Sequence, residues 1–316
     1  MQGDTVYGLL AVRPRQLLEK SRIQLEYLQE IRMRTGKPLL LGYRGREYTV
    51  TETGELSLDM QKACIISREE VEETLEYISG YSLYAFSEEI KQGFITVPGG
   101  HRVGLAGKIV TEENRITCIR YISFINIRLS HQVMGCADCV MSYLVVKNRL
   151  CNTLILSPPG CGKTTLLRDM IRQISDGSSH LRGMTVGVVD ERSELAGSYL
   201  GIPQNDLGIR TDVLDCCPKC QGMMMLLRSM APQVIAVDEI GSREDLAALR
   251  QVQNCGCYLL ASMHGDSFED IRRKENGELL QMFQRFIILG GAPPGTVKEI
   301  LDFSGAVLYR NTGGIA

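Results

Sequence analysis

The sequence predicts an α/β chain of two domains, in which an α+β domain precedes a domain built on a parallel sheet. Its length of 316 residues suits two domains. Helix and strand patterns are mixed in the first part, whereas from Asn152 onward short apolar runs alternate with helical segments. This alternation is typical of βαβ units. The amphipathic stretch Met134–Leu150 separates the two patterns, so we expect domains over residues 1–145 and 146–316.

Two helices are expected in the first domain. Apolar residues at helical spacing predict one helix over Pro14–Ile31. Ser67 followed by Glu70 has the pattern of a capping box, and apolar residues continue on one helical face from Val71 to Ile78. A second helix is therefore predicted to begin after Ser67.

Apolar segments separated by turn residues predict the strands. In the first domain they suggest a mostly antiparallel sheet that includes a hairpin turning at Arg44-Gly45, with strands over Pro38–Tyr43, Glu47–Thr51, Gly93–Val97, Val103–Val110, Ile116–Tyr121 and Ser123–Leu129. In the second domain the predicted strands are Thr153–Leu156, Val186–Val189, Val234–Val237, Tyr258–Ser262 and Ala306–Tyr309.

Charge and composition narrow the possible functions. Lys+Arg number 35 and Asp+Glu 37, for a formal net charge of −2, which argues against a general nucleic-acid coat or a polybasic membrane binder. The apolar stretch Tyr121–Leu129 is interrupted by Arg128, so no membrane span is expected. The first residues lack the basic start and apolar run of a signal peptide. We therefore expect a cytoplasmic protein that reaches a membrane only through a partner.

Two C-x-x-C pairs stand out among the 11 cysteines. They are Cys136/Cys139 and Cys217/Cys220, and neither has a histidine at zinc-finger spacing. We expect reduced thiols in both pairs.

A glycine-rich loop carries the strongest functional signal. It is Ser157-Pro158-Pro159-Gly160-Cys161-Gly162-Lys163-Thr164-Thr165, between a predicted strand and a predicted helix. Its glycines let backbone N–H groups turn towards phosphate oxygens, and the helix start adds partial positive charge. Lys163 is predicted to reach the β- and γ-phosphates of ATP, and Thr164 to offer its hydroxyl to Mg²⁺. Ser157 replaces the usual first glycine of such loops, and it is small enough for the loop to form.

Acidic residues at the ends of other strands supply the remaining chemistry. The strand Val234–Val237 leads into Asp238, a predicted Mg²⁺-side carboxylate, and Glu239, a predicted activator of water. Glu191 and Glu194 follow the strand Val186–Val189 and are alternative water-orienting groups, because ligands bind at the carboxyl ends of parallel strands.

A histidine ends a further strand. In Ser262-Met263-His264-Gly265, His264 is placed to sense the γ-phosphate. Together with the loop and the acids, it predicts a RecA-like P-loop ATPase core with a parallel sheet, in which water attacks the γ-phosphate in line.

These residues together resemble the additional-strand P-loop ATPases that power secretion and pilus assembly. The whole chain resembles more closely the stage III sporulation protein AA family of endospore-forming bacteria. The stretches that carry this resemblance are Gln29–Arg32, Gly93–Gly104, Ile125–Arg128, Val189–Glu194 and Leu227–Pro232.

The resemblance implies a cytoplasmic ATPase with Mg²⁺ as cofactor, the motor of a secretion or channel apparatus between mother cell and forespore. Its partners would be membrane proteins of that channel, and its assembly a homo-hexameric ring with an N-terminal domain that closes over the nucleotide. In the secretion group, arginines of that domain contact the nucleotide. Arg120 and Arg128, in the strand segments before the core, are the candidates here. The acidic segment departs from that of the secretion relatives, so Glu191, Glu194 and Glu239 remain alternatives for the main water activator.

Three other functions remain open. A RecA-like nucleic-acid motor needs a basic, aromatic-rich groove, but aromatic residues are only 6% of the chain and tryptophan is absent. An AAA+ remodelling ATPase needs a helical lid, for which the segment after His264 is short. A nucleotide-gated scaffold would bind ATP and turn it over very slowly.

Overall fold

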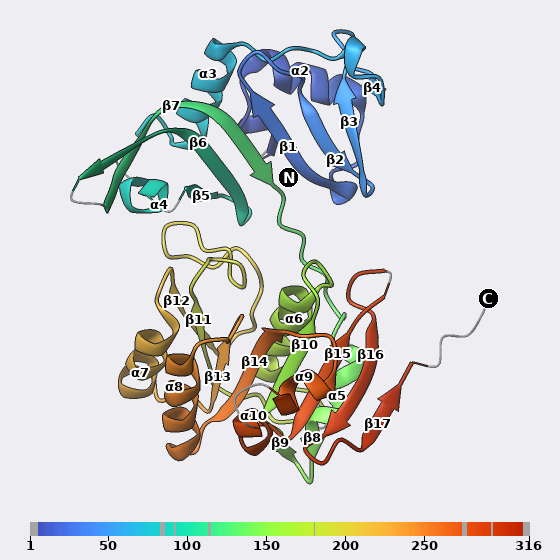
Figure 1. The fold of residues 1–316 in the computed structure, drawn as a ribbon, viewed down its shortest axis with the longest axis vertical. Coiled ribbons are helices and arrows are strands. Elements are labelled where there is room, and N and C mark those ends of the chain that lie inside the picture. Colours follow the sequence, from blue (N-terminus) through green and yellow to red (C-terminus); the bar gives the residue numbers. More distant parts are fainter. Residues whose placement is uncertain are drawn as a thin grey trace. The chain divides into compact units, whose positions relative to one another are not determined.

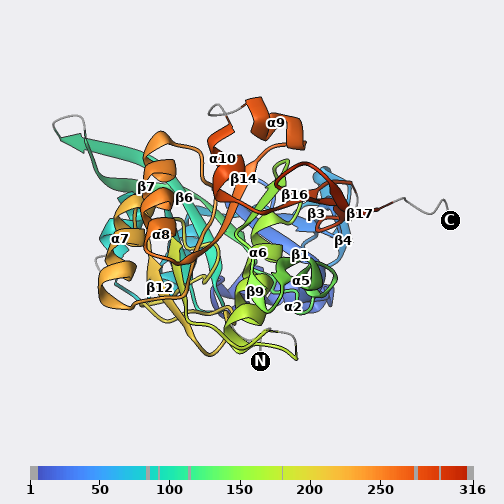
Figure 2. The ribbon, with the colours of Figure 1, turned by 90° about the horizontal axis from the view of Figure 1, so that it is seen from below.

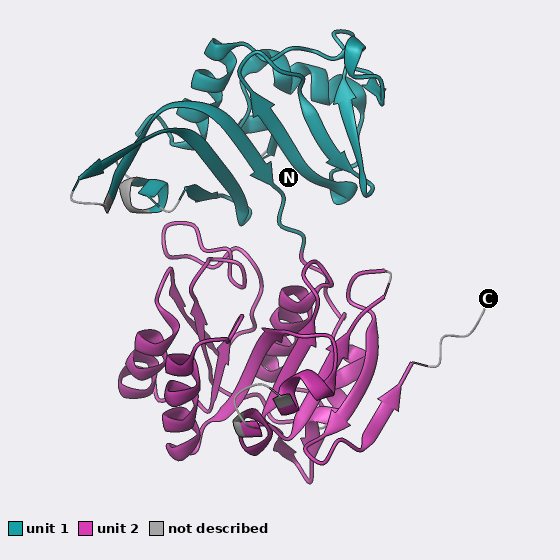
Figure 3. Cartoon of the chain, in the orientation of Figure 1, with its two compact units in different colours: residues 1–131 teal, residues 132–316 magenta. Residues whose placement is uncertain are grey.

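The computed structural model describes residues 6–82, 86–91, 93–112, 115–179, 181–273, 277–291 and 293–311. The chain divides into two compact units, residues 1–131 and 132–316 (Figure 3). Residues 132–145, which the sequence assigns to the first domain, pack with the second unit. Their helix α5 (Asp138–Leu144) places Val140 and Leu144 in the core of that unit. The packing of these apolar residues, rather than the onset of the parallel strands, therefore sets the division.

Unit 1 is built on a seven-stranded sheet whose pairs are all antiparallel, as the sequence predicts. The strand order is β4-β3-β2-β1-β7-β6-β5. The expected turn at Arg44-Gly45 has positive φ at both residues, 50° and 73°, as a tight two-residue hairpin turn requires. The strands are β1 (Leu28–Arg34), β2 (Leu40–Tyr43), β3 (Arg46–Val50), β4 (Leu56–Ser57), β5 (Phe94–Val97), β6 (His101–Glu112) and β7 (Arg115–Arg128).

The predicted helix over Pro14–Ile31 is correct only as far as Ser21. Helix α2 covers Val12–Ser21 and ends at Arg22, which has a left-handed φ of 52°. A short 3₁₀ turn, η1 (Leu25–Tyr27), then leads into β1, the central strand of the sheet. Leu28 and Ile31, which suit a helical face, are buried on this strand instead.

The capped helix is confirmed. Helix α3 (Arg68–Ile78) begins after Ser67, whose side chain accepts the N–H of Glu70 while the Glu70 carboxylate accepts the N–H of Ser67. The unit is completed by the 3₁₀ turn η2 (Met60–Lys62) and helix α4 (Ser87–Lys91).

Strands β6 and β7 form a long hairpin whose outer end projects from the rest of unit 1 (Figure 2). The sequence predicts two strands where β7 is one continuous strand with an irregularity. Its register shifts opposite Gly107, and Tyr121 has a φ of 51°. A Cβ on Gly107 would lie 2.7 Å from the carbonyl oxygens of Arg120 and Tyr121, so the absence of a side chain lets the two strands approach at the bulge.

Unit 2 contains an eight-stranded sheet with the order β12-β11-β13-β14-β10-β15-β16-β17 (Figure 1). The pairs from β12 to β15 are parallel, and β16 and β17 continue antiparallel. Strand β14 lies between β10 and β13, and β14 is thus the additional strand of the predicted ATPase class. The strands are β10 (Thr153–Ser157), β11 (Val186–Asp190), β12 (Thr211–Asp215), β13 (Val234–Val237), β14 (Tyr258–His264), β15 (Arg285–Leu289), β16 (Val297–Asp302) and β17 (Val307–Arg310).

Helices cover both faces of this sheet. One hydrophobic cluster joins the sheet to α5 and α6 (Lys163–Asp176), and the other joins it to α7 (Lys219–Ser229), α8 (Arg243–Asn254), α9 (Phe268–Arg273) and α10 (Glu278–Met282). A small hairpin, β8 (Val145–Val146) and β9 (Arg149–Leu150), follows α5. No helix among the described residues is long and apolar enough to cross a membrane.

The sequence missed three strands of this sheet, β12, β15 and β16. The last expected strand exists as β17, but it pairs antiparallel with β16 at the edge and is exposed. The strand order shows that the segment after His264 extends the sheet.

Candidate functional site

The site residues lie where parallel strands of unit 2 end. Ser157 at the end of β10 stands opposite His264 at the end of β14, and Val189 of β11 stands opposite Val237 of β13. The loops that follow these strands therefore meet at the carboxyl edge of the sheet, where α/β proteins bind ligands.

The glycine-rich loop has the backbone of a phosphate cradle. Gly160 and Gly162 have φ of 75° and 84°, and Gly162 is the N-cap of α6. A Cβ on Gly162 would lie 2.8 Å from the N atom of Gly295, whose N–H bonds to the Cys161 carbonyl. The loop therefore packs against the β15–β16 connection, and only glycine suits this position. The remaining residues, Ser157, Pro158, Pro159, Lys163, Thr164 and Thr165, complete the strand–loop–helix connection that the sequence predicts.

A hydroxyl and a carboxylate meet beside the loop. The Thr164 hydroxyl donates to Asp238 Oδ2 at 2.7 Å, and the Ser262 hydroxyl donates to Asp238 Oδ1. Mg²⁺ is usually held in nucleotide sites by one or two protein oxygens together with phosphate oxygens and water. Thr164 and Asp238 therefore fit the ion that the sequence predicts for them.

Three cationic or ionisable groups converge on Glu239. Lys163 Nζ lies 3.1 Å from Oε1, His264 Nε2 3.2 Å from Oε1, and Arg192 Nη1 2.7 Å from Oε2. Burial raises the pKa of Glu239, but the hydrogen bond and charge of Lys163, aided by Arg192 and His264, outweigh it and hold the pKa below its usual value. The carboxylate is thus ionised and paired with the lysine of the phosphate loop.

The acidic turn after β11 is built around Asp190. Its buried carboxylate accepts backbone N–H groups from Glu194, Leu195 and Ala196. Burial raises the Asp190 pKa to about 6, against the opposing effect of those three donors. The buried Arg168 guanidinium of α6 donates to the carbonyls of Glu194 and Leu195. The turn is therefore fixed by groups beneath it.

The alternative water-orienting acids come together with the strand-end pair. Glu191 and Glu194 line a small cavity with Asp238 and Glu239. The Glu191 carboxylate is exposed and accepts from Lys219 Nζ at 2.6 Å. The structure thus gathers all the acids that the sequence selected.

Arg120 and Arg128 both lie on β7 of unit 1 and are exposed. Arg128 pairs in register with Glu30 and Arg102, and Arg120 with Lys108. Their contact with a nucleotide remains a prediction.

Sequence reasoning missed Arg192, Ser262, Arg168 and Lys219 as members of the site. Arg192 lies within the acidic segment, and a cation between acids at a strand end was the available signal. Ser262 precedes His264 by two positions, so strand alternation places both on one face. Lys219 and Arg168 carry no such signal, because their partners are distant in sequence.

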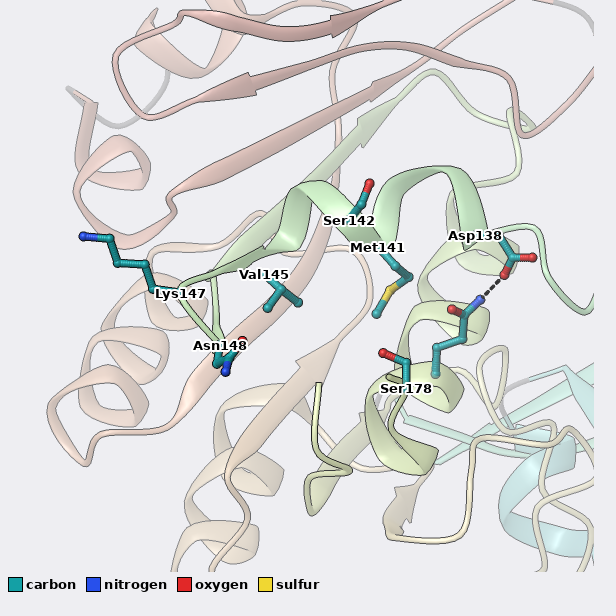
Figure 4. Close-up of a pocket in the computed structure, with 8 residues that line it drawn as sticks. Asp138, Met141, Ser142, Val145, Lys147, Asn148 and Ser178 are labelled. Carbon is teal, nitrogen blue, oxygen red and sulfur yellow. Dashed lines mark hydrogen bonds between the residues drawn. The ribbon is translucent and has the colours of Figure 1, made fainter. Parts of the chain in front are cut away.

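A larger pocket of about 570 Å³ lies elsewhere on unit 2, between α5, the β8–β9 hairpin and the end of α6 (Figure 4). Its lining includes Met141, Val145 and Lys147, and Gln173 Nε2 donates to Asp138 Oδ1 at 2.7 Å. None of the predicted site residues lines it.

The cysteine pairs show no metal site. All eleven cysteines lie in the described ranges and are free thiols. Within those ranges no cluster of three or more His, Cys, Asp or Glu side chains could hold a metal ion.

Solved structures with the same fold are secretion and pilus ATPases. The ATPase DotB of Legionella pneumophila matches with a TM-score of 0.57 and 17% identity, over 92% of this chain and 80% of DotB. The pilus retraction motor PilT, solved with bound ADP, matches with a TM-score of 0.56 and 14% identity, over 94% of this chain and 83% of PilT. The fold of this chain is therefore that of the RecA-like secretion ATPases.

The family follows from sequence similarity. The model of the family described as sporulation stage III, protein AA matches residues 1–308, and the chain belongs to this family. Stage III sporulation protein AA of Bacillus subtilis (strain 168) is 41% identical over 290 residues, which cover 90% of this chain and 90% of that protein. The resemblance inferred from the sequence is confirmed.

Proposed function

We propose that this chain hydrolyses ATP to ADP and phosphate and is the motor of a sporulation secretion or channel apparatus between mother cell and forespore. The observation that carries the proposal is the meeting of Lys163, Thr164, Asp238 and Glu239 at one point beside the phosphate loop. Lys163 and Thr164 begin helix α6, and Asp238 and Glu239 follow strand β13. Together they supply the cation, hydroxyl, metal-side carboxylate and base that hydrolysis requires.

Binding begins with an exchange of partners at Lys163. The ammonium lies at the start of α6 and is almost buried, and it pairs with Glu239 at 3.1 Å and with Asp238 at 3.8 Å. A bound triphosphate would draw Lys163 to the β- and γ-phosphates, together with the N–H groups of Gly160–Thr165. Thr164 and Asp238 would hold Mg²⁺, which neutralises charge on the phosphates when bound.

Hydrolysis then depends on the carboxylate that Lys163 releases. We assign Glu239 Oε1 as the group that orients the attacking water and accepts its proton. His264, 3.2 Å from Oε1, would contact the γ-phosphate side of the site. Glu191 and Glu194, in the cavity shared with Glu239, are the alternative bases.

Family membership supports the wider role. We propose a cytoplasmic protein that membrane proteins of the sporulation channel recruit, and that assembles as a homo-hexameric ring. ATP binding and hydrolysis would move unit 1 relative to the ATPase unit. A protein that binds ATP without hydrolysing it would instead be a nucleotide-gated scaffold.

The first test is nucleotide binding by Lys163→Ala. Lys163 is the only lysine or arginine of the loop sequence Ser157–Thr165, so we expect binding of a fluorescent ATP analogue to fall by at least about 100-fold, the effect of losing a charge-assisted phosphate contact. Lys147→Ala, in the exposed turn of the β8–β9 hairpin, is the control. A Lys163→Ala chain that folds and binds like wild type would show that the loop is not the nucleotide site.

A further inference from the structure

The two carboxylate oxygens of Glu239 have different kinds of partner. Oε1 is shared by Lys163 of the phosphate loop and His264, whereas Oε2 accepts from Arg192 at 2.7 Å. Lys163 is required by an incoming phosphate, but Arg192 belongs to the acidic turn and lies outside the loop. A bound nucleotide would therefore remove a cation from Oε1 and leave the partner of Oε2 in place.

The backbone of Glu239 is held independently of its side chain. Its φ is 53°, a conformation that a residue with a Cβ adopts only when its surroundings enforce it. The Glu239 N–H donates to Asp238 Oδ1 and to the Ser262 hydroxyl, both at 3.0 Å. With the backbone fixed, the partners of the carboxylate decide where the side chain points.

Arg192 is placed to remain the partner of Glu239 Oε2 when a nucleotide binds. The turn that carries it is fixed by the three N–H bonds to Asp190 and by Arg168 beneath. The Arg192 side chain itself is 60% exposed, and a pair of such exposure contributes little to the stability of the fold. Its geometry is therefore better explained by an effect on Glu239 than by a role in folding.

We propose that Arg192 is a positioning residue for hydrolysis, which holds Glu239 Oε2 so that Oε1 faces the attacking water once Lys163 has turned to the phosphates. This inference rests on the proposed ATPase function. Arg192 acts through Glu239 and does not itself contact the nucleotide.

Arg192 should also affect nucleotide binding, independently of turnover. Without Arg192, the full negative charge of Glu239 is left to Lys163 and His264. The phosphates must then compete with a stronger Lys163–Glu239 pair. Removing Arg192 should weaken nucleotide binding while Glu239 is charged, and should have no effect once Glu239 is replaced by glutamine.

The experiment is a double-mutant cycle on the full chain, with Arg192→Ala, Glu239→Gln and the double variant. For a non-hydrolysable ATP analogue, we expect Arg192→Ala to raise Kd about threefold in the wild-type background and to leave it unchanged in the Glu239→Gln background. For phosphate release, we expect Arg192→Ala to lower kcat by up to about 100-fold, the cost of a misplaced catalytic group, and to cause no further loss in Glu239→Gln. Arg192→Lys should recover part of the loss.

Arg310→Ala is the matched control. Arg310 on β17 pairs with Glu299 at 3.1 Å, and the side-chain exposures of this pair, 62% and 17%, resemble the 60% and 23% of Arg192 and Glu239. It lies at the other end of the sheet from the acidic turn, so neither Kd nor kcat should change.

Two results would overturn the proposal. An equal loss of affinity in both backgrounds would mean that Arg192 contacts the phosphates directly, and an unchanged Kd in the wild-type background would mean that it does not hold Glu239. A wild-type chain that binds the analogue but releases no phosphate refutes the proposed hydrolysis, and the affinity cycle still decides whether Arg192 acts on Glu239.

Discussion

At the scale of single residues, the ion pairs of this chain differ mainly in their exposure. The side chains of Lys163 and Glu239 are 7% and 23% exposed, whereas those of Arg68 and Glu72 are 65% and 54% exposed. An exposed pair such as Arg68–Glu72 is screened by water and contributes little to stability. Leaving one partner of a buried pair alone costs roughly 3 kcal/mol or more. The lysine and the acid beside the phosphate loop are therefore costly to leave unpaired.

Some residues of the candidate site could be predicted from the sequence and others could not. Asp238, Glu239 and His264 each follow or end an apolar run, and Lys163 follows the glycine-rich loop, so their positions were predictable, although their roles stay proposals. Arg192 was not recognised, because its contact with Glu239 depends on β11 and β13 being neighbours in the sheet. Strand order is not readable from apolar spacing.

A histidine of unit 1 gives a pH prediction. His101 is 5% exposed, and its Nδ1 accepts the Ser130 N–H at 3.1 Å. Burial, with a smaller effect from the charge of His131, lowers its pKa from 6.5 to about 4. The folded state therefore binds fewer protons than the unfolded state between these values. The free energy of unfolding therefore falls as the pH drops from 6.5 to 4, by on the order of 3 kcal/mol, and above pH 6.5 His101 has no such effect.

His101→Gln should remove this part of the acid sensitivity. Urea unfolding at pH 7, 5.5 and 4.5 would measure it, and the comparison is between the pH slopes of wild type and variant, because the substitution also changes stability at every pH. Equal slopes would show that His101 does not remain neutral in the fold.

At the scale of elements, two of the three missed strands of unit 2 are rich in polar residues, whereas the third, β15, is a buried apolar run inside the sheet. Strand β12 is only half-buried and begins and ends with polar residues, and β16 mixes charged with apolar residues. After Ser21 the sequence predicts a helix where the structure has η1 and then β1. The apolar residues there fit a helical face, but the left-handed conformation of Arg22 ends the helix. Both kinds of error occur where tertiary pairing overrides local pattern.

Two glycines of the phosphate loop should differ in their tolerance of alanine. Both have positive φ, which costs an alanine about 1 kcal/mol. A Cβ on Gly160 meets nothing within 4 Å, but one on Gly162 would lie 2.8 Å from Gly295 N. We expect Gly162→Ala to abolish binding of the ATP analogue and Gly160→Ala to weaken it only severalfold. Equal effects of the two substitutions would show that the contact with Gly295 does not shape the loop.

At the scale of the whole molecule, the chain has two compact units, residues 1–131 and 132–316. The proposed motor requires that unit 1 respond to nucleotide in unit 2. Arg120 and Arg128 are the predicted means, because a guanidinium brought to the γ-phosphate is worth about 10³–10⁵ in rate in other P-loop enzymes.

This link is tested by Arg120→Ala and Arg128→Ala, with Arg46→Ala on the exposed part of β3 as control. At least one of the two should lose turnover while it still binds ATP and folds, and native mass with and without ATP would show whether the proposed ring also changes. Wild-type turnover in both variants would remove unit 1 arginines from the mechanism.

The most direct test of the central claim is steady-state phosphate release by the full chain with ATP and Mg²⁺, with membrane partners present. We expect wild type to release phosphate, and Glu239→Gln to bind ATP but to hydrolyse it about 100-fold or more slowly, the scale of a positioned base. A near-normal Glu239→Gln beside a crippled Glu191→Gln or Glu194→Gln would move the base to the acidic turn. A wild-type chain that binds ATP and releases no phosphate would contradict the claim that this protein is an ATPase.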